Sequence, residues 1–460
     1  MTEVVKSTRQ LLRDSAGARW TALILLASMM FFGYLFVDIL SPLKETLTAM
    51  HGWDSTTFGL YASAEFFLNV FVFFLIFAGI ILDKMGIRFS ALFAGSLMVI
   101  GAAIKLYAMS EAFPGSGLHQ WLSSWWTSFP ANAKLAGIGF MLFGCGCEMA
   151  GITVSKAIAK WFKGKEMALA MGVEMGVARL GGASAFLVAP FIKTHYPDYA
   201  ISGPIAFSLA LLCVGMICFI VYVFMDAKLD KQTAGSLNEA EDPFRVSDLG
   251  KLLKSAPFML IALLCVLYYS AIIPFQRYAT NMLQCNLGMT ESEAGAIFFW
   301  FPIGAAAITP FLGYFLDTRG KGATMLSIGA AVMVMCHLIF AFVPLNVPIA
   351  LGTIVLLGIS FSLVPASLWP SVPKIVPSSY LGTAYALIFW VQNIGLFLTP
   401  ILIGRVLDST NPVGTSSVDL NYTWAMLLFS CFGVVAIFLS LTLKWLDGRH
   451  QYGLELPNKK

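Results

Sequence analysis

Charged residues are scarce in this sequence. Only 12% of its 460 residues are Asp, Glu, Lys or Arg, whereas a soluble domain usually carries about 25%. Apolar stretches of about 20 residues, each long enough to cross a hydrocarbon core of roughly 30 Å, recur along the whole length. Only helices and closed barrels can span lipid, and these stretches lack the alternation of barrel strands. The sequence therefore predicts an all-α membrane protein with many spans.

Further absences exclude whole classes of function. No GxxxxGKS/T loop for ATP and no soluble domain are present, which speaks against a primary pump, and no selectivity-filter sequence suggests a channel. The eight cysteines lie in or beside apolar stretches without clustered histidines, so no metal site, cofactor or disulfide framework is expected. The first 19 residues lack the apolar core of a cleavable signal peptide. We expect a protein that is not an enzyme and binds no nucleic acid.

Twelve apolar stretches are present instead. The predicted helices cover 20–41, 56–82, 88–109, 134–160, 167–192, 202–225, 257–284, 292–315, 322–343, 347–369, 379–405 and 422–446. Residues 226–256 form the longest polar segment and divide the helices six and six. We therefore predict two six-helix bundles, 20–225 and 257–446, joined by this linker and flanked by terminal segments 1–19 and 447–460.

The basic residues predict the orientation in the membrane. Cytoplasmic loops are enriched in Lys and Arg, and most basic residues fall on one side if both termini are cytoplasmic. Only a few then lie on the opposite side: Lys44, Lys134, Lys193 and Arg405. Both termini are therefore predicted to face the cytoplasm.

The two halves contain a repeated loop. GIILDKMGIR (79–88) follows the second predicted helix, and GYFLDTRGKG (313–322) stands at the corresponding place in the second half. Two parallel repeats with a site between them near mid-membrane are typical of alternating-access transporters. Charged residues of these loops are predicted to make and break ion pairs as the bundles rock, and thereby to gate the cytoplasmic side: Asp83, Lys84, Arg88, Asp317 and Arg319.

The first of these loops resembles the signature between the second and third helices of the major facilitator superfamily. Five other segments look like the branch of major facilitator superfamily domain-containing protein 1: WFKGKE (161–166), ARLG (178–181), SLVPASLWPSVPKIVP (362–377), LGTAYALIFWVQNIG (381–395) and PILIGRVLD (400–408). That branch includes a vertebrate lysosomal dipeptide uniporter with a single-span accessory subunit. The resemblance covers nearly the full chain and implies the same fold and dipeptide uniport.

In that branch an acid of helix four and an arginine of helix five are implicated in gripping the two ends of a dipeptide. The matching positions are Glu148, in GCGCEMAG, and Arg179, in GVARLGG. Helix geometry indicates the same pair. At a rise of 1.5 Å per residue, Glu148 and Arg179 each lie about 23 Å from the turn near 163–164, so two antiparallel helices place them at the same depth. Opposite charges at one depth either form a permanent salt bridge or bind a zwitterion. We favour the ligand site because Asn393, not a charge, occupies the position equivalent to Arg179.

Two more pairs of charges fall in the outer half of the predicted spans. Asp38 and Arg277, in the first helix of each half, are predicted to pair across an outer gate. The alternative is that each reaches the membrane interface separately. Glu65 and Lys105 are predicted to form the second pair.

Nearer the cytoplasm, Glu174 is predicted to form a structural bridge with Lys156, with a proton-carrying role as the alternative. Aromatic residues are abundant enough to line a substrate cavity, although most aromatics in such helices pack or face lipid. The candidates for substrate contact are Tyr61, Tyr385 and Trp390.

Three functions stay open at this point. The first is a uniporter of dipeptides or similar small zwitterions, acting as a monomer in the bilayer. The second is a proton-coupled carrier of organic anions that uses Arg179 and Arg277, and the third is a non-transporting sensor or structural protein. The lack of an acidic dileucine signal and a single glycosylation sequon at Asn421 favour a bacterial inner membrane over a lysosomal one.

Overall fold

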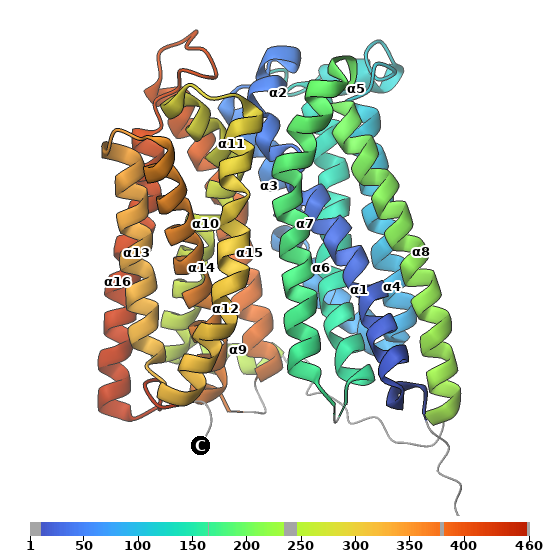
Figure 1. Ribbon diagram of the computed structural model, residues 1–460, viewed down its shortest axis with the longest axis vertical. Coiled ribbons are helices and arrows are strands. Elements are labelled where there is room, and N and C mark those ends of the chain that lie inside the picture. Colours follow the sequence, from blue (N-terminus) through green and yellow to red (C-terminus); the bar gives the residue numbers. More distant parts are fainter. Residues whose placement is uncertain (1–10, 164, 234–245, 378–380, 458–460) are drawn as a thin grey trace, which may run out of the picture.

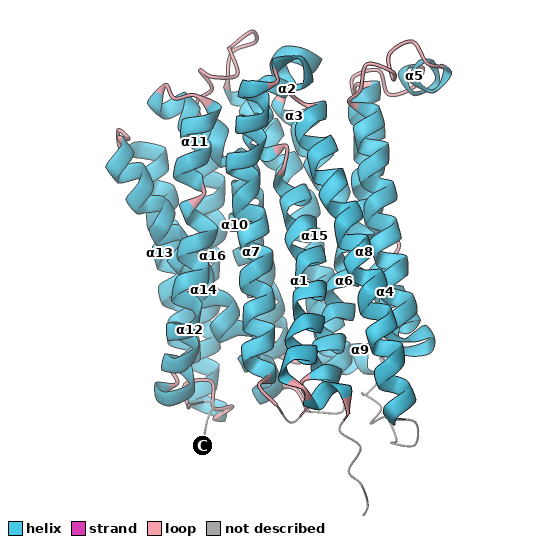
Figure 2. Cartoon of the chain, turned by 45° about the vertical axis from the view of Figure 1, so that its right-hand side comes forward, coloured by secondary structure: helices cyan, strands magenta, loops and turns pink. Residues whose placement is uncertain are grey.

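The computed structural model describes residues 11–163, 165–233, 246–377 and 381–457, and every regular element within these ranges is a helix (Figure 2). Two bundles stand side by side (Figure 1). The first is built of α1 (Ala16–Asp38), α3 (Ser55–Phe71), α4 (Phe74–Ala108), α6 (Ala131–Trp161), α7 (Met167–His195) and α8 (Ser202–Thr233). The second is built of α10 (Ala256–Leu287), α11 (Glu291–Phe298), α12 (Trp300–Arg319), α13 (Gly322–Phe342), α14 (Val347–Ile375), α15 (Leu381–Thr410) and α16 (Thr423–His450). Short helices lie in the connections: α2 (Lys44–His51), α5 (Gly117–Ser123) and α9 (Val246–Leu253).

The second predicted helix, 56–82, is divided in the structure. α3 ends at Phe71, Phe73 adopts a left-handed conformation with φ 56°, and α4 begins at Phe74. α4 then runs through a kink at Gly86, where φ is 78°, so its two arms hold the rest of this segment and most of the third predicted helix. Among the described residues, eleven helical stretches are long and apolar enough to cross a membrane, because α3 alone is too short. The predicted all-α membrane fold is confirmed.

Two other boundaries differ from the prediction. The predicted helix 292–315 is interrupted at Phe299, between α11 and α12. The last helix of the first bundle, α8, continues to Thr233, so the predicted linker 226–256 begins as helix and contains α9 near its end. The polar composition of this linker predicted where the two bundles are connected, but it did not predict how far α8 extends into the linker.

Glycine contacts hold the helices of the first bundle close together. A Cβ atom on Gly101 of α4 would lie 2.4 Å from the carbonyl oxygen of Gly139 on α6, and one on Gly139 would lie 2.5 Å from that of Gly101. Such small residues let transmembrane helices pack at backbone distance. The same device fixes α7 against α1, since a Cβ on Gly181 would lie 2.1 Å from the oxygen of Phe31.

Similar glycine contacts, which we call the glycine seam, hold the two bundles together at the end that is predicted to face outside. A Cβ atom on Gly59 of α3 would lie 2.3 Å from the Pro400 oxygen of α15, and one on Gly404 would lie 2.2 Å from the Ser55 oxygen. The carboxylate of Asp408 on α15 accepts hydrogen bonds from the first two amides of α3, at 3.1 and 2.6 Å. Asp408 therefore caps a helix of the opposite bundle.

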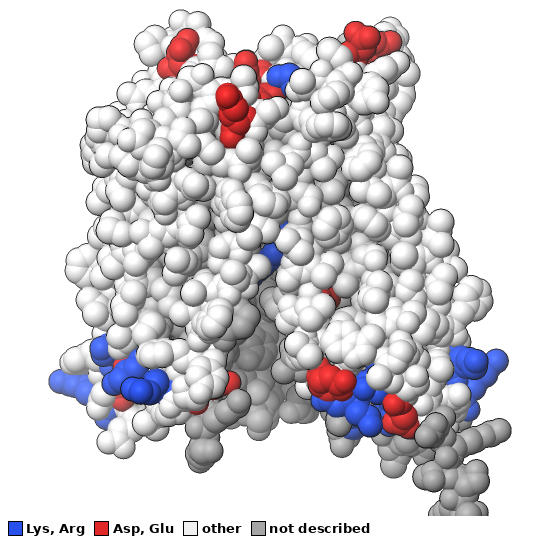
Figure 3. Space-filling view, viewed as in Figure 1, with Lys and Arg blue, Asp and Glu red and all other residues white. Residues whose placement is uncertain are grey.

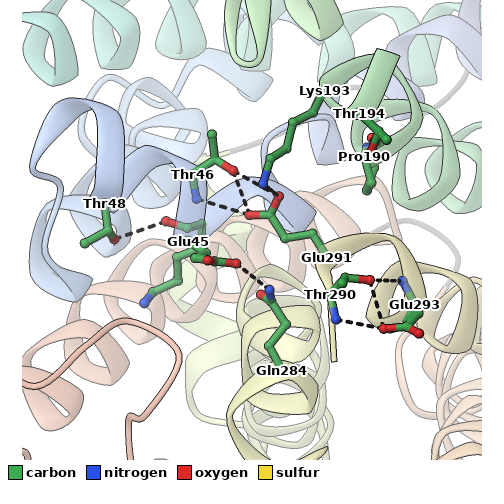
Figure 4. A network of polar contacts seen from close by, with 11 residues as sticks. Glu45, Thr46, Thr48, Pro190, Lys193, Thr194, Gln284, Thr290, Glu291 and Glu293 are labelled. Atoms are coloured by element: carbon green, nitrogen blue, oxygen red, sulfur yellow. Dashed lines mark hydrogen bonds and ion pairs between the residues drawn. The ribbon is translucent and has the colours of Figure 1, made fainter. Parts of the chain in front are cut away.

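A second closure lies at the same end, between the α1–α3 connection and α11 (Figure 4). Glu291 accepts hydrogen bonds from the backbone and hydroxyl of Thr46, and it forms a 2.6 Å ion pair with Lys193 of α7. Beside it, Gln284 of α10 donates to Glu45 at 2.7 Å. Both contacts join the first bundle to the second.

The opposite end of the interface is less tightly packed. Cβ atoms added to Gly79, Gly172 or Gly313 would meet nothing within 4 Å. Lys and Arg side chains gather at this end of both bundles (Figure 3). Among the described residues, the two bundles are therefore held together most tightly at the end predicted to face outside.

Candidate functional site

Arg179 lies where the two bundles meet. Its guanidinium donates a 3.2 Å hydrogen bond to the hydroxyl of Thr309 on α12, and it stands 5.7 Å from the ring centre of Phe361 on α14. The contact of Gly181 with α1 sets the position of this part of α7. An arginine of the first bundle thus contacts two helices of the second.

Glu148 of α6 is half-buried and has no hydrogen bond or ion pair with any described residue. In particular, it forms no salt bridge with Arg179, although the two charges lie at similar depth by helix counting. A permanent salt bridge, which the sequence left open, is absent from this conformation. Both charges are therefore available to a third group.

One arrangement at this depth was not predicted. A Cβ atom on Gly144 would lie 2.2 Å from the oxygen of Glu65, so α6 and α3 touch there. α6 and α3 run in the same direction. Glu148 lies one turn after Gly144 on α6, and Asn69 lies one turn after Glu65 on α3. Asn69 therefore lies near the level of Glu148, and its only signal in the sequence is an amide side chain within an apolar helix.

Above this level, Arg277 of α10 joins the bundles. It pairs with Asp38 at 2.9 Å and with Glu65 at 2.7 Å, and it also donates to the carbonyl of Val37. The contact of Asp38 with Arg277 is the one expected from the sequence, while its role as a gate stays a prediction. Both acids belong to the first bundle, so this cluster also closes the outer end.

The expected pair of Glu65 and Lys105 is wrong, because Arg277 of the opposite bundle takes the carboxylate. The ammonium of Lys105 is fully buried and has no hydrogen-bond partner among the described residues. It lies 4.2 to 5.1 Å from three ring centres, those of Phe36, Phe140 and Tyr61. Tyr61 is consequently buried beside this lysine and stacked on Phe140, not exposed toward the central site.

The expected bridge between Glu174 and Lys156 is also wrong. Lys156 instead pairs with Asp83 at 2.5 Å, because α4 brings this loop acid to the same end of α6. Glu174 is buried and has no hydrogen bond or ion pair within the described part of the chain. It stays a candidate for carrying a proton.

The charged loop residues contact their own bundle in this conformation. Arg88 lies 3.3 Å from Asp230, and Lys160 lies 2.8 Å from Asp226 on α8. Lys84 and Arg319 are exposed, and Asp317 is half-buried. A gating role for these residues across the interface stays a prediction.

The remaining candidates lie on α15. Trp390 donates a 3.0 Å hydrogen bond to the carbonyl of Val70 on α3 and stacks on Phe73. Asn393, one turn from Phe389, donates to its carbonyl at 2.9 Å. Tyr385 packs against Trp369. Trp390 and Asn393 face the first bundle, where α3 is interrupted.

This arrangement is that of a membrane transporter built from two bundles around a central site. A sequence model of the Major Facilitator Superfamily matches residues 26–284 and 278–455. The chain belongs to this superfamily, and it is an integral membrane protein and a transporter, not an enzyme.

Relatives and a solved structure agree with this classification. The protein named Lysosomal dipeptide transporter MFSD1 in Danio rerio is 26% identical over 400 residues, covering 85% of this chain and 81% of that protein. The human protein of the same name is 26% identical over 399 residues, covering 85% and 80%. The crystal structure of a D-xylose-proton symporter has a TM-score of 0.69 at 14% identity and covers 93% of this chain and 97% of that one; this likeness concerns the fold.

Proposed function

We propose that this transporter moves dipeptides or similarly small zwitterions by alternating access, as a uniporter. The observation that carries the proposal is that Glu148 and Arg179, which helix counting places at similar depth, form no ion pair with each other. An unpaired charge within a membrane protein is costly and usually marks a substrate pathway. A ligand with a cation at one end and an anion at the other compensates both.

The chemistry of the two side chains fits the ends of a peptide. The carboxylate of Glu148 accepts hydrogen bonds from the substrate ammonium, while the guanidinium of Arg179 offers the substrate carboxylate two parallel hydrogen bonds. Because Arg179 already touches α12 and α14, a carboxylate held there is also held against the second bundle. Binding then favours closure of the bundles around the ligand, which is the step that alternating access requires.

The names of the relatives support a dipeptide as substrate. They do not support the prediction of a bacterial inner membrane, because the same names place those proteins in the lysosome. An accessory subunit and action as a monomer stay predictions from the family resemblance and the sequence.

A proton-coupled carrier of organic anions is the second candidate. It is favoured by Glu174, a buried carboxylate without a partner among the described residues. In that mechanism Arg179 holds the carboxylate of the substrate and Glu174 carries the proton. The substrate then needs no ammonium group.

A thermal-shift screen of the purified protein separates the two candidates. The panel holds dipeptides, free amino acids, N-acetylated dipeptides, C-amidated dipeptides and small dicarboxylates. Stabilisation only by ligands with both termini free supports the dipeptide proposal, and stabilisation by carboxylates regardless of an amine contradicts it. Saturable uptake of the stabilising ligand into liposomes excludes a non-transporting sensor, and uptake that an imposed pH gradient does not alter supports uniport.

A further inference from the structure

A small cavity with a largely apolar wall lies between the bundles where α3 is interrupted. It has a volume of about 30 Å³ and is lined by Asn69, Phe73, Leu75, Ile76, Ala386, Trp390 and Asn393. Two of these residues carry amide side chains, Asn69 from the first bundle and Asn393 from the second, and each is only 2% exposed. The cavity therefore brings two buried amides together across the interface.

The hydrogen-bonding groups of these amides are largely unused. Neither the nitrogen nor the oxygen of the Asn69 side chain has a partner among the described residues, and the same holds for the oxygen of Asn393. Buried polar groups in native proteins are almost always hydrogen-bonded, so each exception calls for an explanation. Three such atoms on the wall of one cavity indicate a place for a ligand with both donors and acceptors.

The local backbone explains why the cavity exists. The left-handed residue Phe73 ends α3 and leaves the carbonyl of Val70 without its helical partner. Trp390 donates to this carbonyl at 3.0 Å, and its ring stacks on that of Phe73. Trp390 and Phe73 therefore form part of the cavity wall, and the two amides line the same cavity.

The cavity lies at the level of the proposed site. Asn69 stands one turn beyond Glu65, which touches Gly144, and Glu148 stands one turn beyond Gly144. Asn393 corresponds to Arg179 in the sequence repeat. By this counting, the two amides and the two charges lie at similar depth.

We propose that Asn69 and Asn393 recognise the peptide bond of the substrate. The Asn69 nitrogen donates to the substrate carbonyl, and the oxygen of Asn393 or Asn69 accepts from the substrate N–H. The cavity has room for about two water molecules, and a planar amide group replaces them and their hydrogen bonds. This assignment rests on the proposed function, since it divides a dipeptide into an ammonium at Glu148, a carboxylate at Arg179 and an amide between them.

Such a site distinguishes peptides from other zwitterions of equal length. A pocket built to bind N–H and C=O groups rejects an analogue that lacks them, because its own polar groups are then left unpaired. Three ligands vary only the middle of the molecule. Glycylglycine has the full amide, 5-aminolevulinate has CH₂ in place of N–H, and 5-aminopentanoate has neither N–H nor C=O.

The experiment measures the affinity of these three ligands for the wild-type protein and for Asn69→Leu and Asn393→Leu. The wild type should bind glycylglycine about 10- to 100-fold more tightly than 5-aminopentanoate, with 5-aminolevulinate between them. Each leucine variant should lose about tenfold or more for glycylglycine and nothing for 5-aminopentanoate. Leucine replaces a buried amide with an apolar group of similar size. Because the Asn69 amide has no partner among the described residues and Asn393 loses only a bond within its own helix, the ligand-free melting temperature should change little.

Gln392→Leu is the matched control. Gln392 is a buried amide on the same helix, but its oxygen already accepts from Cys265 at 3.3 Å, so this variant should leave the ranking of the three ligands unchanged. Equal loss for all three ligands in the Asn69 and Asn393 variants, or no loss for glycylglycine, overturns the proposal. Failure of the wild type to bind any of them overturns the proposed function itself, which separates the two results.

Discussion

Gly404 is the position where one methyl group should change the conformation of this transporter. A Cβ atom there would lie 2.2 Å from the carbonyl oxygen of Ser55 on the opposite bundle. Carbon–oxygen contacts are normally at least about 3.3 Å long. Gly404→Ala therefore requires α3 and α15 to separate by about 1 Å at the closed end.

The free energy of this change follows from the packing. Adding a methyl group to a well-packed contact costs about 1–3 kcal/mol. The cost applies only to the conformation in which the two helices touch, because the contact is lost when this end opens. The ratio of open to closed molecules at the outer end should therefore rise about 5- to 150-fold.

Distances between spin labels measure this ratio. Labels on Met50 of α2 and Val413 after α15, both exposed and on opposite bundles, should report a longer distance in Gly404→Ala than in the wild type. Gly352→Ala is the control, because a Cβ atom there would meet nothing within 4 Å. If Gly404→Ala gives the same distances as this control, the glycine seam does not hold the closed state.

Three other changes test the contacts around the interface. Asp408→Ala removes the carboxylate that caps α3 and should shift the equilibrium toward an open outer end by about 1 kcal/mol in the same label assay; unchanged distances would rule out the cap as a latch. Arg277→Gln leaves two buried carboxylates without a cation and should destabilise the protein by about 3–5 kcal/mol in thermal or denaturant unfolding, so an unaltered midpoint would contradict the ion-pair cluster. The loop residue Glu166 has its pKa held below the ordinary 4.5 by a backbone hydrogen bond and by Arg19. A lowered pKa stabilises the fold above the unfolded-state value and loses that effect as pH falls through the folded-state value. Glu166→Gln should therefore lower the melting temperature at pH 7 and match the wild type only in acid below the folded-state pKa of Glu166, and a deficit independent of pH would refute this linkage.

The sequence could predict depth along a helix better than the partner of a side chain. Counting residues places Glu65 and Lys105 both in the outer half, yet Arg277 of the other bundle takes the carboxylate. The rotation of each helix and the approach of the second bundle decide this, and neither follows from spacing within one sequence. Asp38 and Arg277 could be matched because each lies near the outer end of the first helix of its half.

The interruption of α3 shows a second limit. Phe73 adopts φ 56° in the middle of FVFFLIF, where no glycine or proline marks a break. Tertiary contacts with Trp390 hold this conformation, so the cavity beside it could not be expected from local preferences. The cap of α3 by Asp408 is likewise a contact between residues far apart in the sequence.

The central claim is that Glu148 holds the amino end of the substrate and Arg179 the carboxyl end. Its most direct test is the affinity of one dipeptide in three forms, free, N-acetylated and C-amidated, for the wild type, Glu148→Gln and Arg179→Ala. The account predicts that Glu148→Gln no longer distinguishes free from acetylated peptide while still rejecting the amide, and that Arg179→Ala does the reverse. Equal loss of affinity for all three forms in both variants would contradict it.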